Sequence, residues 1–167
     1  MPQPLAGFQG TALYLDTMIL VAFLDTLSPW HAASQQLFYR AIEPTRPIRL
    51  VTATLTIDET VFTLLQELLR PPYSVPRSRS QYLGAHPEIV RQIMASVDYG
   101  VQRLLAIISL EPVLPTDINA MCREMIATGT LPRDAIHLAV MRRLGITAIA
   151  SDDDGFDRYP DITLFKP

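Results

Sequence analysis

The run Ala12-Leu13-Tyr14-Leu15-Asp16 is typical of a buried β-strand, because four apolar or aromatic residues follow one another before a carboxylate ends the run. A second run, Ile146-Thr147-Ala148-Ile149-Ala150, is followed shortly by Asp153. In open α/β sheets, ligands bind beyond the carboxyl ends of the strands. The two runs therefore predict that Asp16 and Asp153 lie together at one end of a sheet.

Between and after these two strands, segments of strand character alternate with segments of helical character. We expect further strands at residues 48–53, 113–114 and 162–165, the last of them at the edge of the sheet. Helices are expected at residues 18–24, 31–42, 54–70, 87–108, 116–127 and 131–144. This alternation predicts an α/β fold with a mainly parallel central sheet and helices on both faces.

Two segments have the composition of irregular chain. Residues 1–10 carry two prolines and two glycines, and we expect them to form a lead-in to a single domain of residues 11–167. Residues 73–86 follow Pro71-Pro72 and contain Pro76 and Gly84, which predicts a loop. That loop would carry a small basic cluster.

The composition excludes several classes of function. The net charge of −3 and the pI of about 5.5 give no overall attraction to nucleic acid, so any such binding must rest on metal ions and local basic clusters. Lys166 is the only lysine, which leaves no phosphate-binding loop lysine and no internal lysine for a Schiff base. The absence of an apolar run of 18 residues argues against a membrane helix.

The cellular setting also follows from composition. No signal peptide is evident, and the single cysteine, Cys122, fits a reducing cytoplasm. Hydrophobic residues make up 49% of the chain and its mean hydropathy is +0.18, which is high for a domain of 167 residues. Apolar surface that must be covered predicts a homodimer or a partner interface.

Two further acidic residues lie close to predicted strand ends. Glu59 is in the helix that follows the strand at residues 48–53, and Asp134 is in the first turn of the penultimate helix. Carboxylates that converge repel one another unless a cation holds them, and hard divalent cations such as Mg²⁺ prefer oxygen ligands. The pattern predicts a carboxylate metal site without histidine or cysteine ligands, of the kind that acts on phosphate-containing substrates.

Four acidic motifs follow one another along the chain: Leu15-Asp16-Thr17, Ile57-Asp58-Glu59-Thr60, Arg133-Asp134-Ala135-Ile136-His137-Leu138-Ala139 and Ser151-Asp152-Asp153-Asp154-Gly155-Phe156-Asp157. In this order and spacing they resemble the motifs of a PIN-domain nuclease, and in particular those of the VapC-like toxins of toxin–antitoxin pairs. The resemblance covers roughly residues 11–165.

The resemblance implies a three-layer PIN-like fold and a Mg²⁺- or Mn²⁺-dependent endoribonuclease that leaves 5′-phosphate and 3′-hydroxyl ends. It also implies the toxin of a type II toxin–antitoxin system, with RNA as substrate and a cognate antitoxin protein as partner. By position, Asp16, Glu59, Asp134 and Asp153 would bind the metal, with Asp152 and Asp154 as alternatives to the last. Thr17, Ser151 and His137 would support the site, while the arginines expected to contact RNA phosphates are Arg77, Arg79 and Arg133.

Other readings of the same residues remain open. A non-catalytic PIN-like scaffold that binds RNA or protein is the main alternative; loss of an acidic residue would mark it, and all four are present. A phosphatase of the Asp-x-Asp type is disfavoured because residue 18 is methionine. A phosphoacceptor receiver domain requires a lysine that lies earlier than Lys166.

Overall fold

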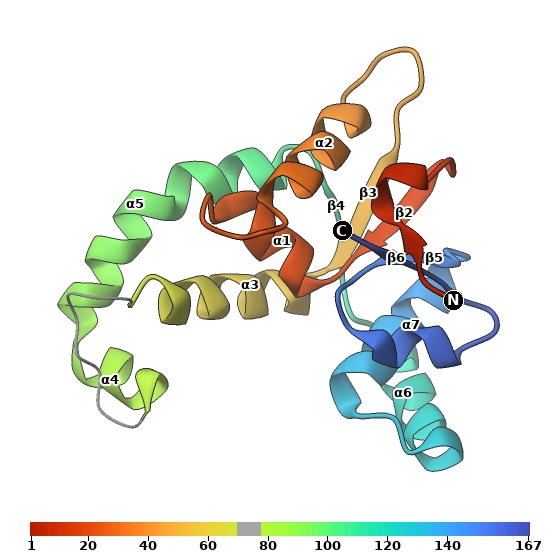
Figure 1. The fold of residues 1–167 in the computed structure, drawn as a ribbon. Helices are drawn as coiled ribbons and strands as arrows, with labels where there is room; N and C mark the ends of the chain where they lie inside the picture. The colour runs from red at the N-terminus through yellow and green to blue at the C-terminus, as the bar shows by residue number, and fades with distance from the viewer. Residues whose placement is uncertain (70–77) are drawn as a thin grey trace.

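Within the described residues, six parallel strands form the centre of the fold, in the order β1-β6-β5-β2-β3-β4. The structure, a computed structural model, describes residues 1–69 and 78–167 (Figure 1). The strands are β1 (Gln3–Pro4), β2 (Ala12–Leu15), β3 (Arg49–Ala53), β4 (Ser109–Glu111), β5 (Ala148–Ala150) and β6 (Thr163–Lys166).

Helices connect the strands and cover both faces of the sheet. They are α1 (Thr17–Leu24), α2 (His31–Ala41), α3 (Thr54–Glu67), α4 (Arg79–Ala85), α5 (Pro87–Leu105), α6 (Pro115–Thr128) and α7 (Pro132–Leu144), with 3-10 turns η1 (Leu5–Gly7) and η2 (Asp154–Arg158). The expected three-layer α/β fold with a parallel sheet is therefore confirmed. Within the described residues, no helix is both long and apolar enough to cross a membrane.

The side chains of β2 alternate between the two faces of the sheet, as a strand requires. Leu13 and Leu15 belong to the apolar cluster that includes Ile19 of α1 and Phe38 of α2. Tyr14 belongs to the other cluster, whose helical members Leu138, Val140 and Met141 come from α7. The side chain of Tyr14 is therefore fully buried where α7 packs on the sheet.

The chain reverses its direction of travel across the sheet at β2. From β2 it moves to β3 and β4 on one side, while β5 and β6 lie on the other. The connections that leave β2 and β5 therefore diverge from the carboxyl ends of two neighbouring strands. Such a switch point is where open α/β sheets bind their ligands.

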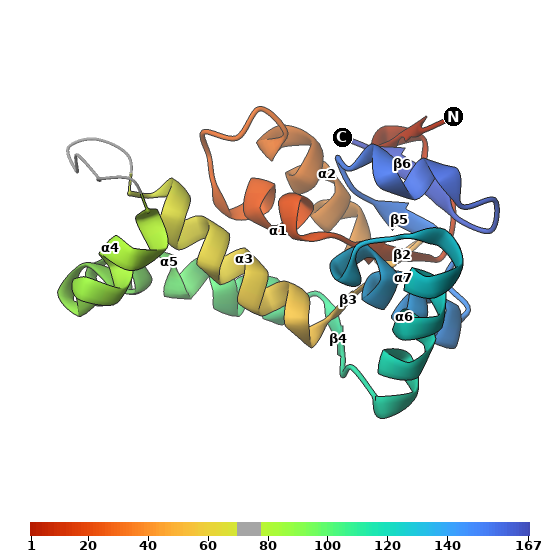
Figure 2. The same cartoon turned by 90° about the horizontal axis from the view of Figure 1, so that it is seen from below.

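A helical arm extends away from the sheet. In Figures 1 and 2, α3 and α5 run outward together, and α4 lies near their far end. The arm has a small apolar cluster of its own, formed by Leu69, Leu83, Ile89 and Ile93. The sheet and the arm thus bury separate groups of side chains.

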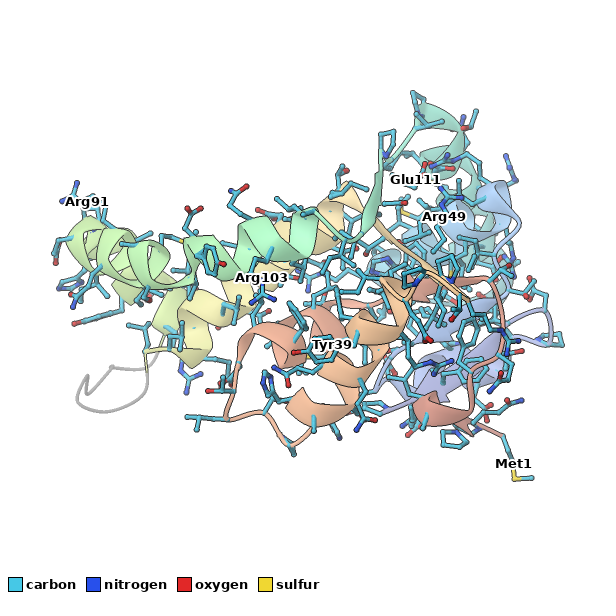
Figure 3. The ribbon with its side chains drawn as sticks, turned by 90° about the horizontal axis from the view of Figure 1, so that it is seen from above. Met1, Tyr39, Arg49, Arg91, Arg103 and Glu111 are labelled. Carbon is cyan, nitrogen blue, oxygen red and sulfur yellow. The ribbon has the colours of Figure 1, made fainter. Side chains whose placement is uncertain are left out.

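The strand predicted at residues 113–114 was wrong. The fourth strand is Ser109–Glu111, which pairs with β3 through the register Thr52↔Leu110. At this edge of the sheet all three residues are only half-buried, so the strand lacks an apolar run. Figure 3 shows Arg49 and Glu111 on the two strands, where Nη2 and Oε1 lie 2.8 Å apart. Leu114 instead serves as the N-cap residue of α6.

Three other expectations need correction. Residues 79–85 form α4 rather than a loop, and Ser78 caps it by accepting a hydrogen bond from the N–H of Gln81 at 3.4 Å. The β6 strand is not at the edge of the sheet, because Gln3 pairs with Phe165. Consequently residues 1–10 are not wholly irregular: they supply the edge strand β1 and a 3-10 turn.

Candidate active site

Asp16 stands at the carboxyl end of β2 and is the N-cap residue of α1. Its Oδ1 accepts a hydrogen bond from the backbone N–H of Thr17 at 2.7 Å, and its Oδ2 accepts one from the hydroxyl of Ser151 at 2.5 Å. Its own N–H donates to the carbonyl of Ala150 at 3.1 Å. The carboxylate is half-buried, and its hydrogen-bond donors come from the start of α1 and from the residue that follows β5.

Glu59 lies in the second turn of α3 and is tied to two other helices. The hydroxyl of Thr17 donates to its Oε2 at 2.9 Å, and Nε of Arg133 lies 2.8 Å from its Oε1. Its side chain is only 13% exposed, although it points away from the apolar stripe of its own helix. The contacts bring α3 to the starts of α1 and α7, where Asp16 and Asp134 stand.

Asp134 is in the first turn of α7 and is half-buried. Burial raises the pKa of its carboxyl group, and the negative charges of Asp153 and Asp16 raise that pKa further, against the opposing influence of His137 and Arg158. The carboxylate of Asp134 is therefore repelled by two of the other predicted acidic residues. This repulsion is the interaction that a bound cation would relieve.

Asp153 follows β5, and its bonding partners differ from those of the neighbouring Asp152 and Asp154. Its N–H donates to Ser151 Oγ at 3.0 Å, and its Oδ1 accepts from the N–H of Gly155 at 2.7 Å. The neighbouring aspartates instead form ion pairs with Lys166, whose Nζ lies 2.7 Å from Asp154 Oδ1 and 3.9 Å from Asp152 Oδ1. These contacts favour Asp153 over Asp152 and Asp154 as the fourth acidic residue.

The acidic residues supply the donor atoms that a divalent cation prefers, but their side chains are not close enough together to bind one as they stand. Their donors are all carboxylate oxygens, which suit a hard divalent cation. Within residues 1–69 and 78–167, however, no three His, Cys, Asp or Glu side chains form a group that could hold a metal ion as they stand. Glu59 is engaged with Arg133. Binding a cation with all four carboxylates would therefore require Glu59 to exchange that partner.

The supporting residues expected from sequence reach the site to different degrees. Thr17 and Ser151 donate hydrogen bonds to Glu59 and Asp16, as given above. The Nδ1 atom of His137 lies 2.9 Å from the hydroxyl of Tyr14. Burial lowers the pKa of His137, against the opposing charges of Asp16, Glu59 and Asp134.

The three predicted RNA-contacting arginines do not come together. Arg133 is 74% exposed and lies beside Glu59. Arg79 begins α4 on the helical arm, with its Nη1 atom 3.7 Å from Oε1 of Glu67. Arg77 lies outside the described residues. Sequence reasoning missed Arg158, whose positive charge acts on Asp134. Sequence reasoning also gave no role to Tyr14, whose hydroxyl contacts Nδ1 of His137. The alternation of β2 places Tyr14 on the face of the sheet away from Leu13 and Leu15.

The PIN domain family matches residues 13–162 of the sequence, so the chain belongs to the PIN-domain family. Members of this family are in general nucleases, and these nucleases generally use divalent metal ions. A comparison of the sequence with curated proteins found no significant match.

Solved structures of toxin–antitoxin proteins have the same fold. VapC20 of Mycobacterium tuberculosis, a Sarcin-Ricin loop cleaving toxin, is 17% identical with a TM-score of 0.56, over 87% of this chain and 92% of that chain. VapBC2 from Rickettsia felis, bound to a promoter DNA fragment, is 10% identical with a TM-score of 0.57, over 93% and 98%. A toxin–antitoxin complex from Klebsiella pneumoniae is 14% identical with a TM-score of 0.53, over 90% and 95%. The family match thus confirms the resemblance to PIN-domain proteins, and the likeness to the VapC toxin structures is one of fold.

Proposed function

We propose that this protein is a divalent-metal-dependent endoribonuclease and the toxin of a type II toxin–antitoxin system. The observation that carries the proposal is the gathering of the acidic residues at the switch point of the sheet. The hydroxyl of Ser151 contacts both the carboxylate of Asp16 and the N–H of Asp153. The carboxylate of Glu59 contacts Thr17 and Arg133, which are the sequence neighbours of Asp16 and Asp134. Folding gathers these charges although each comes from a different segment, and nothing in a purely structural role requires that cost. Membership of a nuclease family supports the same conclusion.

Asp16, Glu59, Asp134 and Asp153 would hold the cation, which we propose to be Mg²⁺ or Mn²⁺. A divalent cation there supplies Lewis-acid chemistry for phosphodiester hydrolysis, by activating water and stabilising negative charge. The chain's own groups orient the carboxylates: the hydroxyls of Ser151 and Thr17 fix Asp16 and Glu59. Hydrolysis adds water across one P–O bond and leaves a 5′-phosphate and a 3′-hydroxyl.

The structural relatives support the substrate and the partner that we propose. VapC20 is a Sarcin-Ricin loop cleaving toxin, which supports RNA as the substrate class here. VapBC2 and the Klebsiella complex support a protein antitoxin as partner. We place the activity in the cytoplasm, where RNA is available and where Cys122 stays reduced.

A cleavage assay on labelled RNA tests the proposed function. Purified protein without antitoxin should cleave RNA in Mn²⁺, lose that activity in EDTA, and regain it when Mn²⁺ is restored in excess. A mixed RNA pool supplies many sequences, because the target is unknown. RNA binding without cleavage in any divalent metal would reject the nuclease and favour the scaffold alternative.

Arg133 is expected to contact an RNA phosphate when RNA is bound. Arg133→Ala should reduce the slope of log binding constant against log salt concentration by about 0.7, the contribution of one phosphate contact to a single strand. Fluorescence anisotropy in EDTA measures the slope while the RNA stays intact. Arg49→Ala is the matched control, since Arg49 is also an exposed arginine in an ion pair but stands at the amino end of its strand. Equal slopes for wild type and Arg133→Ala would contradict this role.

We also propose a homodimer. Several large apolar side chains are exposed, among them Ile126 at 86%, Leu27 at 76% and Tyr99 at 75%, and association would cover such surface. Light scattering across a dilution series should give about twice the chain mass of 18.7 kDa. A mass of one chain at every concentration would contradict the dimer.

A further inference from the structure

A buried pair of aromatic side chains, Tyr14 and His137, has no part in the chemistry above. Tyr14 is 0% and His137 2% exposed. The hydroxyl of Tyr14 lies 2.9 Å from Nδ1 of His137 and also accepts a hydrogen bond from the N–H of Ala53 at 3.2 Å. The two rings meet edge to face, with their centroids 5.6 Å apart. One hydroxyl thus connects β2, the end of β3 and α7.

Each of those three elements carries one of the acidic residues Asp16, Glu59 and Asp134 or leads directly into the segment that does. Asp16 follows Tyr14 by two residues, and Glu59 lies on the helix that begins directly after Ala53. Asp134 stands one turn before His137 on α7. A displacement of any of these elements would stretch the shared hydrogen bonds. The pair is therefore placed to fix the positions of the three carboxylates relative to one another.

The direction of the hydrogen bond between Tyr14 and His137 follows from the available partners. Among the described residues, the one side chain that forms a hydrogen bond of good geometry with the Tyr14 hydroxyl is His137, so we assign Nδ1 as the acceptor of the phenol proton. The phenol of tyrosine ordinarily carries its proton at neutral pH, so this hydroxyl has a proton to donate. A neutral imidazole that accepts at Nδ1 carries its proton on Nε2.

The imidazole therefore has a donor to offer to the acidic residues. Asp16, Glu59 and Asp134 are the negative charges that act on the ring, and Arg133 is a positive charge that opposes them. Within the part of the chain that the structure describes, Nε2 makes no hydrogen bond. A carboxylate, directly or through one water molecule, is the natural acceptor for this N–H group.

We propose that Tyr14 is a positioning residue of the candidate active site, which acts through His137 by fixing the tautomer that presents Nε2–H to the carboxylates. The proposal deepens the proposed function and rests on it. Partners that orient metal-site groups from outside are known to set both metal affinity and activity, and their loss costs about 10–100-fold.

Tyr14→Phe tests the proposal, because it keeps the ring and removes the hydroxyl. We expect the affinity for Mn²⁺ and the kcat for RNA cleavage each to fall by about 10–100-fold, while the KM for RNA changes little. In ¹⁵N NMR, His137 of wild type should show a protonated Nε2 and a hydrogen-bonded, unprotonated Nδ1. The variant should lose that fixed pattern.

Tyr159→Phe is the matched control. Tyr159 is also a buried tyrosine, 5% exposed, and its hydroxyl bonds to the side chain of Thr130. It should lose a comparable amount of thermal stability but keep wild-type metal affinity and kcat. Equal losses of kcat in both variants would show that Tyr14 acts through general stability, and would overturn the proposal.

Two further outcomes separate this inference from the proposed function. A wild-type spectrum with the proton on Nδ1 would overturn the inference even if Tyr14→Phe fails to fold. Unchanged cleavage and metal affinity in Tyr14→Phe would also overturn it, with the nuclease intact. If wild type neither binds Mn²⁺ nor cleaves RNA, the proposed function fails, and this inference fails with it whatever tautomer the spectrum shows.

Discussion

Asp16→Asn is expected to reduce metal-dependent RNA cleavage at least ~100-fold while leaving the fold intact. Loss of a group that only supports a metal site costs about 10–100-fold, so loss of a ligand charge should cost at least as much. Asparagine is as good an N-cap as aspartate, and its oxygen can still accept from the N–H of Thr17. Its amide can face the hydroxyl of Ser151, which accepts as well as donates.

The control for this variant is Asp154→Asn. Asp154 is 83% exposed and paired with Lys166, so its charge is directed away from the acidic residues. It should cleave RNA at a rate close to that of wild type. Circular dichroism and thermal melts establish that both variants are folded. Cleavage by Asp16→Asn that is near wild type and still sensitive to EDTA would remove Asp16 from the site.

Asp134→Asn should remove most of the stability that metal confers. A ligand that binds only the folded state at about a hundred times its dissociation constant adds roughly 2.7 kcal/mol to the free energy of unfolding. Wild type should show this gain in Mn²⁺ relative to EDTA. The variant should show little of it, because the site has lost one of its charged oxygen donors. Thermal melts of both proteins with and without Mn²⁺ measure the difference.

The same variant has a predicted pH dependence in EDTA. The pKa of Asp134 is raised in the folded state, so the folded protein binds that proton more tightly than the unfolded chain does. This contribution is fully present below the unfolded pKa and is lost as the pH rises through the raised folded pKa. Across that acidic window wild type should lose stability relative to Asp134→Asn, and at neutral pH the variant should be at least as stable. Coincident pH profiles, or a full metal-dependent gain in the variant, would contradict the shared site.

The strands next to the acidic residues could be predicted because they are buried on both faces. The β2 and β5 strands read as continuous apolar runs, as parallel strands in the middle of a sheet do. The edge strands carry no such signal. The β1 strand has two exposed residues, one of them proline, and β4 is half-buried throughout. Their existence depends on pairing with β6 and β3, which local sequence does not encode.

The helix α4 was missed for a related reason. It has seven residues, which is too short to be stable alone. Its buried residue Leu83 packs with Ile89 and Ile93 of α5, and that contact is tertiary. The preceding prolines and Gly84 therefore favoured a loop in the sequence, where no local signal for a helix opposed them.

Much of the candidate site followed from spacing, while its supporting contacts did not. The acidic residues stand at strand ends or in the turns that follow, where position along the chain fixes their place. The pairing of Tyr14 with His137 spans 123 residues, and a buried tyrosine in a strand is ordinarily core. The distinction between Asp153 and its neighbours rests on Lys166, which approaches from β6. Such contacts exist only once the sheet is assembled.

The placement of β5 next to β2 bears on how the protein is made. Asp16 leaves the ribosome well before Ser151, which follows it by 135 residues, and Asp153 comes two residues later still. A nascent chain that ends before β5 lacks the hydroxyl that holds Asp16 and the carboxylate that faces Asp134. The proposed nuclease site is therefore expected to be complete only once β5 has been synthesised and has paired with β2.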